Sequence, residues 1–121
     1  MDRPSVLLLT DDPSIARAIE MLLRDWGFDG KAAGSAWDKP CSGRAMAPVA
    51  GILVDLVDMQ IGTALDNAVA LRQRVGAPVP ILIQSNNGYT TVPGRSEERV
   101  TILAKPVDPA RIRAWLTAGS P

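Results

Sequence analysis

The chain has 121 residues, of which 46% are hydrophobic and 21% charged, so we expect one globular domain over residues 1–121. Its 13 basic and 13 acidic residues cancel, which excludes a bulk attraction to nucleic acid or to a membrane surface. The absence of histidine and the single cysteine, Cys41, exclude a histidine general base and an intrachain disulfide. Any metal would therefore need oxygen ligands, and no signal peptide opens the chain, so a cytoplasmic protein is expected.

Five short apolar runs predict the strands of a sheet. Runs without polar alternation are typical of parallel strands that are covered on both faces. The second run is weak and predicts an edge strand. In chain order the five are Ser5–Thr10, 28–33, 52–55, 79–84 and Val100–Ala104.

Helices are predicted between these strands. After the first strand, Pro13 opens a helix with Ser14 as its expected N-cap, and Gly27 ends it. Residues 63–75 predict a further helix, and the last begins with Asp108 as its N-cap. Glycines, prolines and asparagines disfavour long helices elsewhere, so the remaining two are expected to be short or irregular, near residues 42–46 and 95–98. This alternation predicts a doubly wound α/β sheet with helices on both faces.

Polar residues follow four of the predicted strands where each leaves the sheet. They are Asp11 and Asp12, Asp55, Ser85, and Lys105. Parallel strands bring these ends to one edge, where open α/β sheets bind ligands. A divalent cation such as Mg²⁺ would relieve the repulsion between the carboxylates. A carboxylate nucleophile, a metal site, a lysine and a hydroxyl are the groups that formation of an aspartyl phosphate requires.

The ordered segments LLLTDD, ILVDL, ILIQS and ILAKP resemble the receiver domain of two-component response regulators, over residues 5 to about 118. No one of these segments is specific alone, and the resemblance rests on their order. It implies a flavodoxin-like, five-stranded parallel sheet in the order 2-1-3-4-5. It also implies a stand-alone phosphoacceptor that catalyses only its own phosphorylation and dephosphorylation.

The same resemblance assigns roles to individual residues. Asp55 would accept the phosphoryl group, Ser85 would bond a phosphoryl oxygen, and Lys105 would pair with the phosphorylated carboxylate. The donor would be a sensor histidine kinase or a histidine phosphotransfer protein, and the output would pass through contact with a downstream protein. Binding of nucleic acid or membrane is not expected, and homodimerisation is left open. The implied Mg²⁺ ligands are Asp11, Asp12, Asp55 and the backbone carbonyl of Val57.

Departures from the family pattern affect the output surface. Met59 stands where the family usually has proline, Asn86 where a small residue is usual, and Ile102 where a tyrosine or phenylalanine reports phosphorylation. The alternative function is therefore a pseudo-receiver, an interaction module that is independent of phosphorylation. A metal-dependent phosphohydrolase is a third candidate, but the Asp55-x-x-Asp58 spacing does not suit it.

Each site residue also has a purely structural explanation when it is taken alone. An aspartate such as Asp12 commonly caps a helix, and Lys105 could be a solvated charge. Trp26 and Trp115 are expected to be helix-packing residues rather than a binding platform. The functional interpretation rests on the joint pattern of the strand ends.

Overall fold

The computed structural model describes residues 4–10, 12–32, 49–55, 61–85, 98–105 and 107–118. Five parallel strands form one sheet in the order β2-β1-β3-β4-β5, as the resemblance implied. All five predicted strands are present. Their bounds are β1 Ser5–Thr10, β2 Asp29–Ala32, β3 Val49–Asp55, β4 Ile81–Ser85 and β5 Val100–Ala104.

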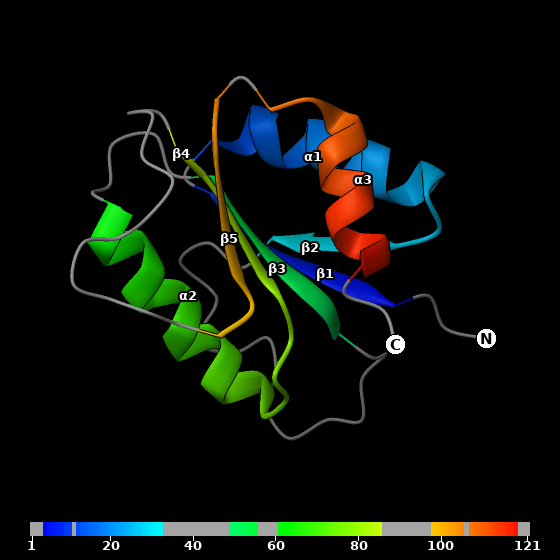
Figure 1. Cartoon of the computed structure of the whole chain (residues 1–121). Helices are drawn as coiled ribbons and strands as arrows, with labels where there is room; N and C mark the ends of the chain where they lie inside the picture. The colour runs from blue at the N-terminus through cyan, green and yellow to red at the C-terminus, as the bar shows by residue number, and fades with distance from the viewer. Residues whose placement is uncertain are drawn as a thin grey trace.

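Helices cover both faces of this sheet, so the doubly wound architecture is confirmed. Helices α1 (Pro13–Asp25) and α3 (Pro109–Ala118) lie on one face, and α2 (Ile61–Val75) lies on the other (Figure 1). The short helix predicted at 42–46 and most of the one predicted at 95–98 fall outside the described residues. Among the described residues, no helix is long and apolar enough to cross a membrane.

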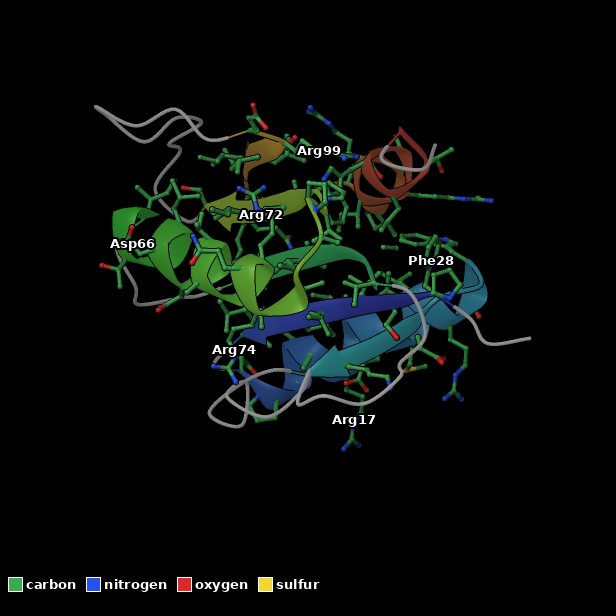
Figure 2. All side chains as sticks on the ribbon, turned by 90° about the horizontal axis from the view of Figure 1, so that it is seen from below. Arg17, Phe28, Asp66, Arg72, Arg74 and Arg99 are labelled. Carbon is green, nitrogen blue, oxygen red and sulfur yellow. The ribbon has the colours of Figure 1, made fainter. Side chains whose placement is uncertain are left out.

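Alternating side chains divide the core into two parts, one on each face of the sheet. The α1/α3 core consists of Val6, Leu8, Ile19, Leu23, Leu53, Leu82, Ile112 and Leu116. The α2 core consists of Leu7, Leu9, Ile52, Val54, Ala64, Leu65, Ala68, Leu71, Val79, Ile81 and Ile83. Trp26, Phe28 and Trp115 pack partly buried against the α1/α3 core, as predicted for the tryptophans, and Figure 2 shows Phe28 on that side.

The predicted N-cap of α1 was wrong by two residues. The cap is Asp12, because its carboxylate accepts hydrogen bonds from the backbone N–H groups of Ser14 and Ile15, and Ser14 lies inside the first turn. At the other end Gly27 has φ +91°, a conformation that favours glycine after a helix. The cap predicted for α3 is confirmed, since the Asp108 carboxylate accepts a hydrogen bond from Ala110 N at 2.9 Å.

The strands also differ from the predicted bounds at their entrances. β4 begins at Ile81 rather than at residue 79, because Pro80 has no N–H to donate to the sheet. The carbonyl of Pro80 still accepts from Ile52 N at 2.9 Å. Arg72 of α2 donates a hydrogen bond from Nη1 to the carbonyl of Glu98 at 2.7 Å, two residues before β5 begins. Figure 2 shows Arg72 reaching from α2 toward the turn that carries Arg99.

Gly51 of β3 lies close against Trp115 of α3. A Cβ placed on it would lie 2.8 Å from the Cη2 atom of Trp115, and the backbone carbonyl of Pro80 lies 3.2 Å away on another side. Gly51→Ala is therefore expected to lower the unfolding free energy by about 1–3 kcal/mol through overpacking. Gly62→Ala is the matched control, because a Cβ at Gly62 in α2 meets nothing within 4 Å. That control is expected to be neutral or stabilising by up to about 1 kcal/mol.

Urea unfolding of both variants checks this pair. Equal destabilisation by the two substitutions, or none at Gly51, would contradict the packing of Trp115 against β3.

Candidate functional site

An ion pair between Asp55 and Lys105 is the centre of the candidate site. Asp55 is the last residue of β3, and Lys105 follows the end of β5, so their contact crosses over β4. The side chain of Asp55 is only 6% exposed and that of Lys105 is 24% exposed. A carboxylate buried to this degree needs a positive partner, and Lys105 supplies it. Lys105 is therefore not merely a solvated charge.

Ser85 ends β4, between the strands that carry the ion pair. It is 6% exposed, and its backbone carbonyl accepts a hydrogen bond from Lys105 N at 2.8 Å. This bond continues the β4–β5 pairing by one residue beyond Ala104, the register partner of Ser85. The backbone of Lys105 is thereby fixed at the sheet edge, from which its side chain extends to Asp55.

Asp12 lies on the other side of Asp55. Thr10, the last residue of β1, is the register partner of Asp55, and Asp12 follows it by two residues. Its Oδ1 accepts from Ser14 N at 2.8 Å and from Ile15 N at 3.4 Å, while its own N–H donates to Thr10 Oγ1 at 3.2 Å. Asp12 is thus a helix cap whose second oxygen, Oδ2, has no hydrogen bond to any residue that the structure describes.

The donor atoms at this edge suit a hard cation. Asp55 ends β3 and Asp12 follows β1, the neighbouring strand, and both provide carboxylate oxygens, the ligand type that Mg²⁺ prefers. Within the described ranges, no three aspartate, glutamate, histidine or cysteine side chains gather closely enough to hold a metal. Asp11 and Val57, the other two predicted ligands, lie outside those ranges. Met59 and Asn86, two of the departures from the family pattern, also lie outside them.

Comparison with known proteins gives matches at the level of structure. No family model matches the sequence, and no curated protein matches it. A sensor protein from Polaromonas sp. JS666 superposes with a TM-score of 0.70 and 26% identity, over 98% of this chain and 96% of that one. A response regulator receiver domain protein from Bacillus halodurans C-125 gives 0.69 and 24%, over 99% of both chains.

A third similar structure is described with a metal. It is the receiver domain of the sensor histidine kinase PA1611 from Pseudomonas aeruginosa PAO1, with magnesium coordinated in its active-site cleft. Its TM-score is 0.66, with 19% identity over 98% of each chain. The chain has the receiver-domain fold. Its sheet order and the near-complete coverage of these matches agree with the expectation from the four strand-end segments.

Within this receiver fold, the sequence analysis missed one polar residue at the site, Gln84. It precedes Ser85 in β4, is 8% exposed, and is the register partner of Asp55. Its amide nitrogen is buried and has no hydrogen-bond partner among the described residues. The signal in the sequence was a glutamine directly after the apolar residues 81–83 and before Ser85, which was assigned to the predicted strand 79–84.

The capping role of Asp12 can be separated from the charge of its carboxylate. Asp12→Ala removes the oxygen that accepts from Ser14 and Ile15, so we expect a loss of about 1 kcal/mol in unfolding free energy. Asp12→Asn keeps an oxygen acceptor and is expected to stay within about 0.5 kcal/mol of wild type. Urea unfolding measures both, and an equal loss in the two variants would contradict a role for the cap.

Proposed function

We propose that this receiver fold accepts a phosphoryl group on Asp55, in two-component signal transduction. The observation that carries the proposal is the buried Asp55 carboxylate, paired with Lys105 at the carboxyl edge of a parallel sheet. Similar structures support it, because they include a response regulator receiver domain and the receiver domain of a sensor histidine kinase. The proposed donor is a sensor histidine kinase or a histidine phosphotransfer protein.

The proposed reaction needs little covalent chemistry from the protein. One oxygen of Asp55 forms a bond to phosphorus while the bond from phosphorus to the donor's nitrogen or oxygen breaks, and the electron pair leaves with the donor. Lys105 neutralises charge on the transferred group, and Ser85 donates its hydroxyl to a phosphoryl oxygen. Positioning and charge neutralisation of this kind account for most catalysis of phosphoryl transfer.

A magnesium ion fits the donor chemistry of this edge. Asp55 and Asp12 would hold it, with Asp11 and the Val57 carbonyl as the further proposed ligands. When bound, the ion would supply positive charge against the phosphoryl oxygens. Asp12→Asn removes a charged ligand while it keeps the cap, so it is also expected to weaken Mg²⁺ binding, measured by titration calorimetry.

In this proposal, residues 1–121 form a single receiver domain, which catalyses only its own phosphorylation and dephosphorylation. Its balanced charge gives no bulk attraction to nucleic acid, so the proposed output is contact with another protein. We place this activity in the cytoplasm as part of the same proposal.

Intact-mass spectrometry tests the proposed function. The protein is incubated with Mg²⁺ and a small acyl phosphate such as acetyl phosphate. Wild type is expected to gain the mass of one phosphoryl group, and omission of Mg²⁺ is expected to slow the gain strongly. Wild type that gains no mass would contradict the proposal.

A pseudo-receiver that acts without phosphorylation is the second candidate. The observation in its favour is Ile102, which is partly buried and packs against the α2 core at the position where receivers often carry a switching aromatic residue. A pseudo-receiver would bind its partner equally well before and after incubation with acyl phosphate. It would also gain no phosphoryl mass, so the same measurement separates the two candidates.

A further inference from the structure

Gln84 carries a buried polar group that has no hydrogen-bond partner among the described residues. The residues before it in β4 are all buried and apolar, and the exposure of Gln84 itself is 8%. Its Nε2 finds no acceptor among the described residues. A buried donor without a partner destabilises a fold, whereas an apolar side chain of similar size would not. A glutamine at this point therefore costs stability that a methionine or leucine would avoid.

The sheet register places this glutamine beside the candidate phosphoacceptor. Asp55 and Gln84 are direct partners in neighbouring strands, and Gln84 is in turn the partner of Leu103 in β5. Strand alternation puts Gln84 on the same face as Leu82, and Asp55 on the same face as Leu53, both of the α1/α3 core. Asp55 and Gln84 thus share one face at one level of the sheet.

The ion pair passes over the same position. Lys105 follows Leu103 by two residues and reaches Asp55 from β5, although β4 lies between the two strands. The strand position that this contact crosses is that of Gln84 and Ser85. The register therefore places the buried amide beside the ion pair, on the same face of the sheet.

We propose that the Gln84 side-chain amide is a further hydrogen-bond donor to the acyl phosphate on Asp55. This inference rests on the proposed function. Before phosphorylation, Lys105 contacts an oxygen of Asp55. Phosphorylation places negative charge on three new phosphoryl oxygens, and the Lys105 ammonium moves from the Asp55 oxygen to pair with them. One carboxylate oxygen becomes the bridge to phosphorus and the other becomes an uncharged carbonyl, for which the amide of Gln84 is a suitable neutral donor.

The position predicts an unusual combination of effects for Gln84→Met. The Gln84 amide has no partner among the described residues, so its removal is expected to leave the urea midpoint unchanged or to raise it. The rate of phosphorylation by acetyl phosphate with Mg²⁺ is expected to fall at least about 10-fold, because a hydrogen bond that forms only on the way to the acyl phosphate is lost. A residue that serves only packing would not produce slower phosphorylation in a protein of equal or greater stability.

The matched control is Gln73→Met, the same substitution at an exposed position of α2. It is expected to phosphorylate at the wild-type rate. Gln84→Met that phosphorylates as fast as wild type, or a Gln73→Met that is slowed equally, would overturn the inference. Wild type that gains no phosphoryl mass would overturn the proposed function itself, which is a distinguishable result.

A second measurement uses the wild-type protein and does not depend on how a variant folds. Glutamine side chains labelled with ¹⁵N can be followed by NMR, and the chain has only Gln60, Gln73 and Gln84 to assign. Beryllofluoride with Mg²⁺ serves as the probe, since it mimics a phosphoryl group on a carboxylate. The Gln84 amide protons are expected to shift and to exchange more slowly with water, while those of Gln73 stay unchanged. No response at Gln84 in a protein that binds the probe would overturn the inference.

Discussion

Asp55→Asn is expected to abolish phosphorylation by acetyl phosphate, with a loss of at least about 10³-fold in rate. The amide of asparagine is a poor nucleophile, and it cannot supply the charged oxygen that would form the bond to phosphorus. The substitution also removes a negative charge from the proposed Mg²⁺ site. Intact-mass spectrometry with Mg²⁺ present measures the loss directly.

Asp66→Asn on α2 is the control for this experiment. Figure 2 shows Asp66 on the helix that covers the opposite face of the sheet from α1 and α3, and the residue is exposed. Its phosphorylation is expected to equal that of wild type. Phosphoryl gain by Asp55→Asn at the wild-type rate would mean that another residue accepts the group.

Lys105→Met is expected to have the largest effect on stability among the site variants. It leaves the Asp55 carboxylate buried without its cation, and breaking a buried pair in this way typically costs about 3–5 kcal/mol. Lys105 is 24% exposed, so water reaches part of the site, and we expect a smaller loss of about 2–3 kcal/mol. Urea unfolding measures it.

A double-mutant cycle assigns this loss to the ion pair. Asp55→Asn combined with Lys105→Met leaves no charge at either position, so the double variant is expected to recover to within about 1 kcal/mol of wild type. Lys31→Met in β2 is the control, because Lys31 is exposed, and it should change the unfolding free energy by less than about 0.5 kcal/mol. Additive losses in the double variant would argue against a stabilising contact between the two residues.

The architecture was predictable because its signals are local and repeated. The strands around Leu8, Leu53 and Leu82 are short apolar runs, and the chain alternates them with helices of periodic apolar pattern. The order of the strands in the sheet cannot be predicted from these local patterns, and it was predicted from the resemblance to receiver domains. The predicted element boundaries were less accurate. Strand β4 begins after Pro80, at Ile81, and the N-cap of α1 is Asp12 rather than Ser14.

The site was predictable in part. Because parallel strands end on one edge of a sheet, Asp55 and Lys105 were predicted to lie close together. In the structure they form an ion pair. Gln84 was not predicted as a site residue, because it was counted within the strand 79–84 and only Ser85, the next residue, was counted as a strand end. Its importance depends on register with Asp55, which is a property of the paired strands and not of either segment alone.

Chemical trapping of the phosphoryl group tests directly whether Asp55 accepts it. Protein phosphorylated with acetyl phosphate and Mg²⁺ is reduced with borohydride, which converts an aspartyl phosphate to homoserine, and peptides are then sequenced by tandem mass spectrometry. We expect homoserine at position 55 in wild type and nowhere in Asp55→Asn. Homoserine at another aspartate, or no reduced residue in protein that has gained phosphoryl mass, would contradict it.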